Sequence, residues 1–293
     1  MDCEKNKGVL ILGASGLIGR YLFNYLFKNT SRKIIGTYAS NKIEGLIPFD
    51  FSSQRLSELP LEGIKYVVIC SAITKLDECR KNPEYSNKVN VEATERILTD
   101  SAEKNIFPIF FSSAAVFDGV IGGYKEKDKK NPVNLYGEQK ARVEDFIRTN
   151  LERYLIVRPG KVFGIKLGEG VLFSEWFSKF RNNEKILCAD DEQLSPHYVE
   201  DVAKSVEILF NSGAQGIYHI NPPEHYSRYE IAKRFFYYLG VEYEKLTRCS
   251  IDDFGFAEKQ RARNTFLDAS KFIKETGFKF TTIEKCFELV KSL

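Results

Sequence analysis

The chain has 293 residues, of which 43% are hydrophobic and 28% charged, and its 43 basic residues are nearly balanced by 40 acidic ones. This is the composition of a globular protein with a sizeable core, and it excludes a largely disordered chain. The net charge of +3 comes from interspersed acidic and basic residues, so it indicates no nucleic-acid partner. No apolar segment approaches the about 20 residues of a transmembrane helix, so we expect no membrane partner either.

Six cysteines are scattered along the chain, without the spacing of a zinc site or of a Cys-x-x-Cys pair. We therefore expect no metal site, and the scatter is typical of a reducing compartment. The first residues are polar, and the apolar segment Val9–Leu12 runs directly into glycines, unlike a signal peptide. These features predict a cytoplasmic protein.

Strand and helix patterns alternate through the first half of the chain. Short apolar segments predict strands at Val9–Leu12, Lys33–Tyr38, Leu46–Phe51, Tyr66–Cys70, Phe107–Phe111 and Tyr154–Val157. Helical spacing of apolar residues predicts helices at Leu17–Phe27, Pro83–Asn105 and Asn134–Asn150. This alternation predicts an α/β fold with a Rossmann-type, doubly wound parallel sheet.

The pattern changes after residue 158. Helices are predicted near 171–182, 199–211, 227–239 and 281–291, with short strands near 186–188 and 216–220. We interpret them as a smaller C-terminal α/β substrate lobe above the strand ends. The predicted division is a dinucleotide-binding domain at 1–158 and mainly a substrate-binding lobe at 159–293, with some segments of the latter returning to the first domain.

A glycine-rich loop, GASGLIG, joins the first strand to the first helix. Gly13 allows a sharp turn, Gly16 lets backbone N–H groups approach a pyrophosphate at the helix N-terminus, and Gly19 lets the helix pack close to the strand. The strand before it and the helix after it are the context that a dinucleotide site requires. We assign this loop to the cofactor site: Gly13, Ser15, Gly16, Leu17, Ile18 and Gly19.

The end of the second predicted strand bears on the identity of the cofactor. NAD sites commonly carry an acidic residue there, which bonds the ribose 2′-hydroxyl. This chain has no acidic residue before Glu44, whereas Ser40, Asn41 and Lys42 could receive a 2′-phosphate. NADP is therefore favoured over NAD, although Lys42 as a surface lysine and a site that accepts both remain open. Asp50 either contacts the adenine side of the cofactor or caps a helix that begins near Ser52.

Tyr136 and Lys140 lie four residues apart in a predicted helix and so project from one face. A lysine there can favour the ionised form of the phenol, whose pKa is otherwise near ~10. The same spacing occurs twice elsewhere in the chain, so the pair alone is weak evidence. Its position after a strand that ends in Ser112 and Ser113 distinguishes it from the other two.

Several segments now resemble a known family in their order and spacing. They are GASGLIG at 13–19, FFSSAAVFDG at 110–119, NPVNLYGEQK at 131–140, LSPHYVEDVA at 194–203, GIYHI at 216–220 and RARNTFLD at 261–268. Together they resemble the extended short-chain dehydrogenase/reductase superfamily, and more narrowly the dTDP-4-dehydrorhamnose reductase family.

The resemblance implies roles for three residues. Tyr136 would be the general acid that protonates a substrate carbonyl as hydride arrives, and Ser113 would hydrogen-bond the same carbonyl. Lys140 would bind the nicotinamide ribose and lower the pKa of Tyr136. The alternative for Ser113 is a cap at the strand end. We also place three residues near the fourth strand in the cofactor site: Ser71, Ala72 and Asn90.

Substrate contacts are assigned to Ser113, Tyr136 and Ala114. Where the family usually has an Asp-Tyr pair, this chain has Ala114-Ala115, which leaves the sugar undetermined. The Ser-Pro-His turn ending in His197 resembles the family's Ser-Pro-Thr turn and predicts a substrate contact.

Arginines recognise the diphosphate of a nucleotide sugar through forked donors, which makes Arg261 and Arg263 candidates. Two surface arginines before a helix cap are the alternative. Lys161 either reaches the substrate or is an exposed surface lysine, and the second interpretation is the simpler one.

The favoured function is an NADPH-dependent reductase of a nucleotide-linked 4-keto-6-deoxy sugar, and a homodimer is compatible with the sequence. One alternative is a nucleotide-sugar epimerase or dehydratase that retains NAD, although the missing second-strand acid counts against it. The other is a non-catalytic regulatory subunit similar to the β subunit of methionine adenosyltransferase, which resembles the same family.

Overall fold

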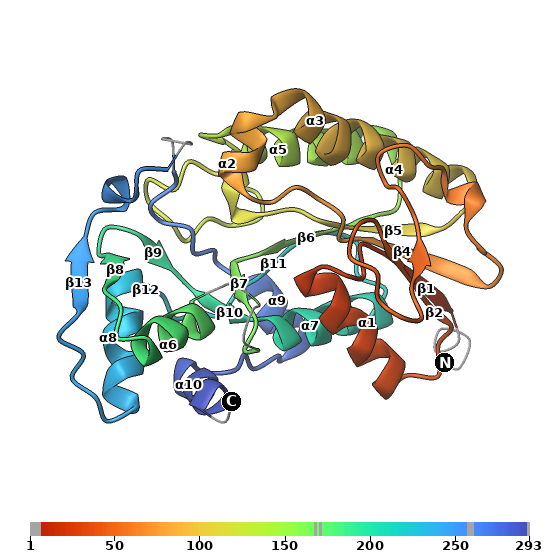
Figure 1. The fold of residues 1–293 in the computed structure, drawn as a ribbon. Coiled ribbons are helices and arrows are strands. Elements are labelled where there is room, and N and C mark those ends of the chain that lie inside the picture. The colour runs from red at the N-terminus through yellow and green to blue at the C-terminus, as the bar shows by residue number, and fades with distance from the viewer. Residues whose placement is uncertain (1–6, 167–168, 170–171, 257–260, 292–293) are drawn as a thin grey trace.

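The computed structural model describes residues 7–166, 169, 172–256 and 261–291. A seven-stranded parallel sheet forms its centre, in the order β11-β6-β5-β4-β1-β2-β3 (Figure 1). The strands are β1 (Gly8–Leu12), β2 (Ile34–Tyr38), β3 (Ile47–Pro48), β4 (Ile64–Ile69), β5 (Phe107–Phe111), β6 (Leu155–Pro159) and β11 (Gly216–Ile220). The chain winds outward in both directions from β1 and β4, which confirms the predicted Rossmann-type fold.

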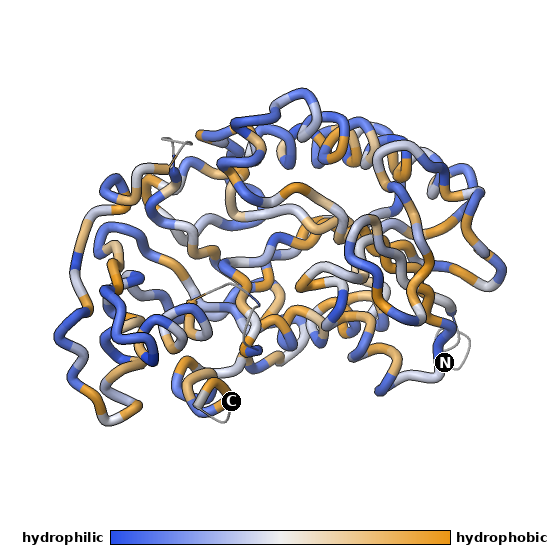
Figure 2. The backbone as a smooth tube through the Cα atoms, in the orientation of Figure 1, coloured by the Kyte–Doolittle hydropathy of each residue, from blue (hydrophilic) through white to orange (hydrophobic). Residues whose placement is uncertain are grey.

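The sheet is covered on both faces because side chains alternate along each strand. Val9 and Ile11 face one layer of helices, and Leu10 and Leu12 face the other. The first layer contains α1 (Leu17–Asn29), α7 (Val199–Asn211) and α9 (Ser270–Thr276). The second layer contains α2 (Leu76–Lys81), α3 (Pro83–Asn87), α4 (Thr94–Glu103) and α5 (Leu135–Asn150) (Figure 1). Hydrophobic positions accordingly concentrate along the strands in Figure 2.

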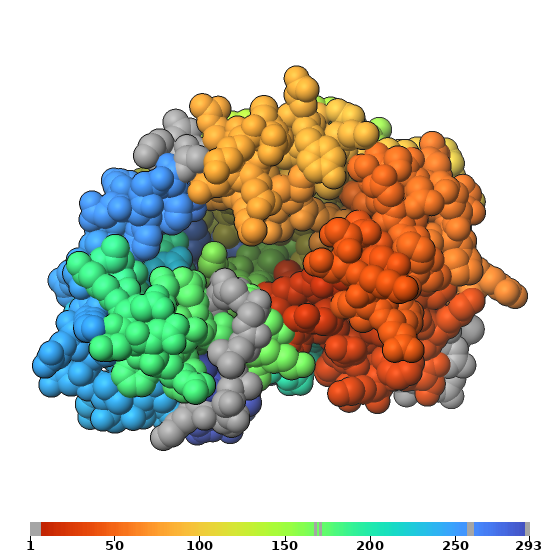
Figure 3. Space-filling model, viewed as in Figure 1, coloured from red at the N-terminus to blue at the C-terminus, as the bar shows by residue number. Residues whose placement is uncertain are grey.

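A smaller lobe lies beyond the carboxyl ends of the strands. Its helices are α6 (Phe173–Arg181), α8 (Arg228–Tyr238) and α10 (Ile283–Lys291). Its short strands are β7 (Lys161–Phe163), β8 (Ile186–Ala189), β9 (Gln193–Leu194), β10 (Pro196–Tyr198), β12 (Tyr226–Ser227) and β13 (Leu246–Cys249). They pair as β7–β10, β8–β13 and β9–β12 around an aromatic core that includes Phe173, Trp176 and Phe235. Figure 3 shows the surface hollowed between this lobe and the segment around α2 and α3.

Three elements that follow residue 158 return to the central sheet. Helices α7 and α9 pack in the same layer as α1, and β11 pairs with β6 along its whole length, from Gly216↔Leu155 to Ile220↔Pro159. The helix near 199–211 and the strand near 216–220 therefore do not lie in the smaller lobe. The carboxyl end of β11 reaches the same edge of the sheet as those of β5 and β6.

The single helix expected at 83–105 is interrupted. A π-helical turn, Lys88–Ala93, separates α3 from α4 and turns Asn90 into the protein interior. There the Asn90 side chain bonds both backbone groups of Ile73, at 2.8 and 2.9 Å. These long-range bonds compensate for the wider turn, which periodicity within the helix could not predict.

Three smaller differences concern short elements. The strand expected at Leu46–Phe51 is reduced to β3, in which Pro48 has no N–H for a further ladder bond. Helices α2 and α9, with six and seven residues, were not predicted because so short a segment shows no clear helical periodicity of apolar residues.

No described helix is both long enough and apolar enough to cross a membrane.

Candidate active site

The glycine-rich loop closes tightly between β1 and α1. Gly13 has a φ of +81°, and a Cβ at this position would lie 2.7 Å from the Ser71 hydroxyl oxygen. A Cβ at Gly19 would lie 2.3 Å from the carbonyl oxygen of Gly13. The loop after β1 and the first turn of α1 are therefore in direct backbone contact. Gly13 and Gly19 both require glycine for this reason.

The same loop leaves the N-terminus of α1 open. Gly16 is the exposed N-cap residue, and neither a side-chain cap nor an acidic residue satisfies the first-turn N–H groups. The side chains of Leu17 and Ile18 pack against the core of the smaller lobe, so this end of the helix offers backbone donors. Ser15 lies half-buried in the turn. Free amides and the positive end of the helix dipole fit the pyrophosphate of a dinucleotide.

The segment after β2 is the predicted ribose site. Thr37 accepts a hydrogen bond from the Gly13 N–H at 3.2 Å, which joins β2 to the glycine loop. The next polar residues, Ser40, Asn41 and Lys42, are all exposed, with no acidic side chain among them. This end of β2 therefore presents exposed polar side chains and no carboxylate among them.

Asp50 has a local structural role. Its carboxylate accepts hydrogen bonds from the Ser53 hydroxyl at 2.6 Å and from the hydroxyl and N–H of Ser52 at 2.7 and 2.9 Å. These bonds, those from Ser53 and Ser52 foremost, hold the pKa of Asp50 below its usual value. The geometry matches the capping alternative, although the capped segment is a turn and not a helix.

The segment after β4 lies against the glycine loop. Ser71 and Ala72 are half-buried there, with Ser71 beside Gly13. Asn90 stands behind this segment, and its amide also donates to Gln139 on α5 at 2.8 Å. Asn90 therefore holds the loop after β4 in place. Its side-chain amide group forms hydrogen bonds with Ile73 and Gln139.

Ser113, Tyr136 and Lys140 converge at the carboxyl end of β5. Asn134 caps α5 by accepting from the Gly137 N–H at 3.0 Å, which fixes the start of the helix. Lys140 is buried and donates to the carbonyl of Phe111, the last residue of β5, at 2.8 Å. Its ammonium lies 5.8 Å from the centre of the Tyr136 ring.

Burial sets the protonation of both residues. It raises the pKa of Tyr136 to about 12, and the neighbouring Ser113 hydroxyl opposes this only in part. Burial also lowers the pKa of Lys140 to about 8. Desolvation of the phenol raises the pKa of Tyr136 more than the hydrogen bond with Ser113 lowers it, so the net shift is opposite to the lowering expected from Lys140. Tyr136 thus carries its proton at neutral pH.

A buried ion pair behind these residues was missed in the sequence. Arg158 on β6 binds Glu144 on α5 through two bonds, Nε to Oε1 at 2.8 Å and Nη2 to Oε2 at 2.5 Å. Ser112 donates to the same carboxylate, and Arg158 also contacts His219 on β11 at 3.1 Å. Two signals could have revealed it: Glu144 follows Lys140 by one helical turn, and Arg158 ends an apolar strand.

Two predicted substrate residues have other partners. His197 has no exposed surface and packs edge-on against Phe280, which argues against a substrate contact. Arg263 is bound by the carboxylates of Asp191 and Asp252 within the smaller lobe. These are long-range contacts of the folded chain, which the local sequence does not reveal.

Arg261 stays at the cleft. It stacks 3.5 Å above the Phe256 ring and pairs at 2.9 Å with Asp77 on α2, across from the smaller lobe. Ala114, by contrast, is buried in the 3-10 turn Ala114–Val116 after β5.

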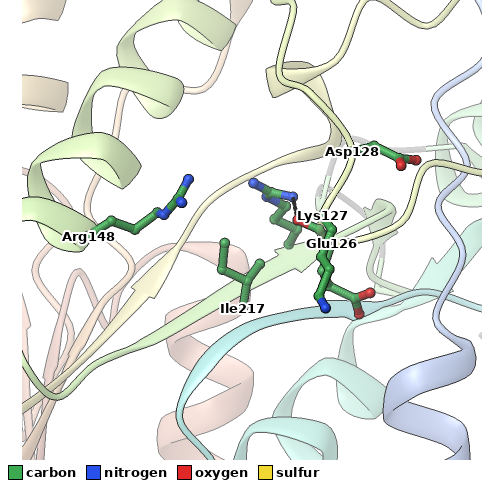
Figure 4. A pocket seen from close by; sticks show the side chains of 6 residues that line it. Glu126, Lys127, Asp128, Arg148 and Ile217 are labelled. Carbon is green, nitrogen blue, oxygen red and sulfur yellow. Dashed lines mark hydrogen bonds between the residues drawn. The ribbon is translucent and has the colours of Figure 1, made fainter.

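The cavity in Figure 4 is separate from this site. It lies between the loop at 126–128, helix α5 and strands β6 and β11. Except for Arg158, whose guanidinium binds Glu144, its lining has no residue in common with the site described above. The lining residues are Glu126, Lys127, Asp128, Arg148, Arg158 and Ile217. Within the described ranges, no cluster of three or more His, Cys, Asp or Glu side chains could hold a metal ion.

Comparison with known proteins gives four findings that bear on the site. Residues 7–290 match the RmlD substrate binding domain. The methionine adenosyltransferase 2 subunit beta of Xenopus tropicalis is 31% identical over 77% of this chain and 70% of its own length. The probable low-salt glycan biosynthesis reductase Agl14 of Haloferax volcanii is 25% identical over 94% of both chains. Among solved structures, a hypothetical dTDP-4-dehydrorhamnose reductase from Sulfolobus tokodaii has a TM-score of 0.84 and 25% identity, over 95% of this chain and 98% of that one.

Gly19→Ala is expected to destabilise the fold by about 1–3 kcal/mol, because the new methyl group must displace the carbonyl of Gly13. Gly16→Ala is the matched control, since its nearest neighbour would lie 3.4 Å away and its φ of −75° suits alanine. That variant should keep the stability of the fold but lose affinity for a dinucleotide at the open helix end. Thermal unfolding measures the change in stability, and NADPH fluorescence titration measures the change in affinity. An equal loss of stability in both variants would contradict the close backbone contact between Gly13 and Gly19.

Lys140→Met is expected to raise the free energy of unfolding at pH 7 by on the order of 1–3 kcal/mol, because the variant buries no charge. The folded pKa of about 8 lies below the ordinary value of 10.5, so between these values the unfolded chain binds more protons. The wild-type chain therefore gains stability as the pH rises through this window, and the advantage of the variant shrinks. Urea unfolding at pH 7 and near pH 10 measures this, and a difference independent of pH would refute it.

Proposed function

This chain belongs to the RmlD substrate binding domain family, and we propose that it acts there as an NAD(P)H-dependent reductase of a nucleotide-linked 4-keto-6-deoxy sugar. The observation that carries the proposal is the convergence of Ser113, Tyr136 and Lys140 beside an open, glycine-lined helix N-terminus. The similarity to a probable glycan biosynthesis reductase over 94% of both chains supports a reduction of this class.

The residues have the properties that carbonyl reduction requires. When bound, the reduced nicotinamide would supply hydride to the carbonyl carbon. Tyr136 holds a proton, with its pKa raised by burial, and would donate it to the carbonyl oxygen. Ser113 would hydrogen-bond the same oxygen, so two donors would stabilise the developing alkoxide. Lys140 would bind the ribose hydroxyls of the cofactor. Its ammonium would also keep a positive charge near Tyr136.

The preferred cofactor of this proposal is NADPH. Ser40, Asn41 and Lys42 are exposed after β2, and no carboxylate stands among them to repel a 2′-phosphate. The observation that would favour the alternative, an epimerase or dehydratase, is NAD that copurifies with the protein and turns over without net oxidation.

Tyr136→Phe is expected to lower turnover by roughly 100- to 10,000-fold while the affinity for NADPH changes by no more than about twofold, because the variant lacks only the proton donor. NADPH oxidation is followed by absorbance against a panel of nucleotide-linked 4-keto-6-deoxy sugars, with NADH in parallel. Tyr237→Phe, at a residue 86% exposed on α8, controls for loss of a tyrosine hydroxyl. Normal turnover by the Tyr136 variant would remove Tyr136 from the mechanism.

A second candidate is a non-catalytic regulatory subunit. It is favoured by the 31% identity to the methionine adenosyltransferase 2 subunit beta of Xenopus tropicalis. An intact reductase triad does not oppose it, because a bound dinucleotide can also stabilise a fold that serves as a partner surface.

The second candidate predicts a stable complex with a methionine adenosyltransferase catalytic subunit. Size-exclusion chromatography of the mixed proteins should show coelution, and Tyr136→Phe should leave the complex unchanged since it alters no exposed surface. Coelution without oxidation of NADPH by any sugar of the panel would replace the reductase proposal. Oxidation without coelution would reject the subunit role.

A further inference from the structure

The cavity in Figure 4 lies on the face of the sheet that α5 covers, beside the edge strand β11. Its volume is about 230 Å³. Arg148 reaches from α5 toward the loop that carries Glu126 and Lys127, above Ile217 of β11 (Figure 4). The cavity is therefore a hollow between a helix, a loop and the sheet, apart from the crevice between the two lobes.

Arg158 forms the inner wall of the cavity and is only 1% exposed. Its Nε and Nη2 donate to Glu144, while Nη1 contacts the ring of His219 at 3.1 Å and the carbonyl oxygen of Glu126 at 3.4 Å. A guanidinium has five N–H groups, so one N–H of Nη2 has no partner among the described residues. A buried donor without an acceptor is unfavourable, and an oxygen placed in the cavity would satisfy it.

Two further cations line the mouth of the cavity, Arg148 on α5 and Lys127 on the loop. Both side chains are exposed, and neither has a hydrogen bond or an ion pair with any residue that the structure describes. The two lining carboxylates, Glu126 and Asp128, accept hydrogen bonds from backbone N–H groups at 3.1 and 2.7 Å. Of the three cations around this hollow, only Arg158 therefore has a carboxylate partner.

The size and the lining of the cavity indicate the class of ligand. A phosphate group has several oxygens, which match the forked donors of Arg148, the ammonium of Lys127 and the remaining N–H of Arg158. Ile217 offers an apolar floor for carbon atoms, and the two lining carboxylates can accept hydroxyl groups. A volume of about 230 Å³ is below the about 300–1,000 Å³ of pockets for drug-sized ligands. The ligand is therefore small, with a phosphate at one end and hydroxyl groups at the other.

The cavity is connected to the chemical site through one face of α5. Four residues recur there at intervals of four and so project from the same side of the helix: Tyr136, Lys140, Glu144 and Arg148. The first two belong to the chemical site, and the last borders the cavity. Arg158 binds Glu144 between them and also lines the cavity. A ligand held here would thus contact the ion pair that joins β6 to α5 without entering the crevice.

We propose that this cavity is a second ligand site, which binds the phosphate group of a small phosphorylated polyol such as a sugar phosphate. Arg148 and Lys127 would hold the phosphate from the solvent side, and Nη2 of Arg158 would donate to it from the interior. The inference goes beyond the proposed reduction, because none of these three residues takes part in the transfer of hydride or proton.

The test is titration calorimetry of the full chain with glucose 6-phosphate, inorganic phosphate and glucose. Excess NADP⁺ keeps the glycine-rich loop occupied, and an ionic strength of about 0.15 M screens nonspecific attraction. Arg148→Gln should weaken the binding of glucose 6-phosphate by about tenfold or more, as expected for loss of a charge-assisted contact. Arg142→Gln is the matched control on the same helix, because its side chain is 59% exposed, pairs with Glu95 and lies outside the cavity lining.

The three probes identify which part of the ligand is recognised. Binding of glucose 6-phosphate that is tighter than that of inorganic phosphate, absent for glucose and weakened only by Arg148→Gln is the expected result. Equal affinity for the two phosphates would reject the polyol and assign the cavity to free phosphate. A wild-type chain that binds neither phosphate, or Arg148→Gln with an affinity within about twofold of wild type, would overturn the inference. NADPH oxidation does not enter this measurement, so its failure is distinct from a failure of the reductase proposal.

Discussion

The bidentate ion pair between Arg158 and Glu144 joins the elements that carry Ser113, Tyr136 and Lys140. It connects β6 to α5, and through Ser112 and His219 it reaches β5 and β11. Both side chains are almost completely buried, so removing either partner would leave an uncompensated charge at a cost of about 3–5 kcal/mol. Ser113 is one residue from Ser112, and Lys140 is one helical turn from Glu144. The relative positions of the strand ends and the α5 helix thus depend on one interaction outside the crevice.

Burial is what makes this site chemically useful, and it also opposes the fold. The same desolvation that keeps the proton on Tyr136 penalises the charge of Lys140. The carbonyl of Phe111 and the buried Glu144 offset part of that penalty for Lys140. A protonated phenol beside a buried, mostly charged amine is unfavourable in isolation, and the ion pair between Arg158 and Glu144 lies directly behind it. Stability and activity are therefore expected to respond in opposite directions to changes at Lys140.

Local patterns allowed much of the fold and part of the site to be predicted from sequence. The glycine loop, the strand alternation and the Tyr136–Lys140 spacing depend on neighbours within a few residues. What was missed depends on distant partners: the turn at Asn90 is bonded to Ile73, and β11 returns to pair with β6. Arg263 and His197 belong to the same class, since two carboxylates and a phenylalanine remote in sequence decide their roles. No periodicity or motif contains that information.

The two candidate functions share the glycine-rich loop and differ in the chemistry that the end of β5 must perform. A regulatory subunit needs a stable fold and an outer surface, and it has no use for a buried amine beside a buried phenol. Lys140 is such an amine, because burial lowers its pKa to about 8, and Tyr136 is such a phenol, because burial raises its pKa to about 12. Burying the charge of Lys140 opposes folding. The electrostatics of these two residues thus favour a site of proton transfer over residues retained only as part of a scaffold.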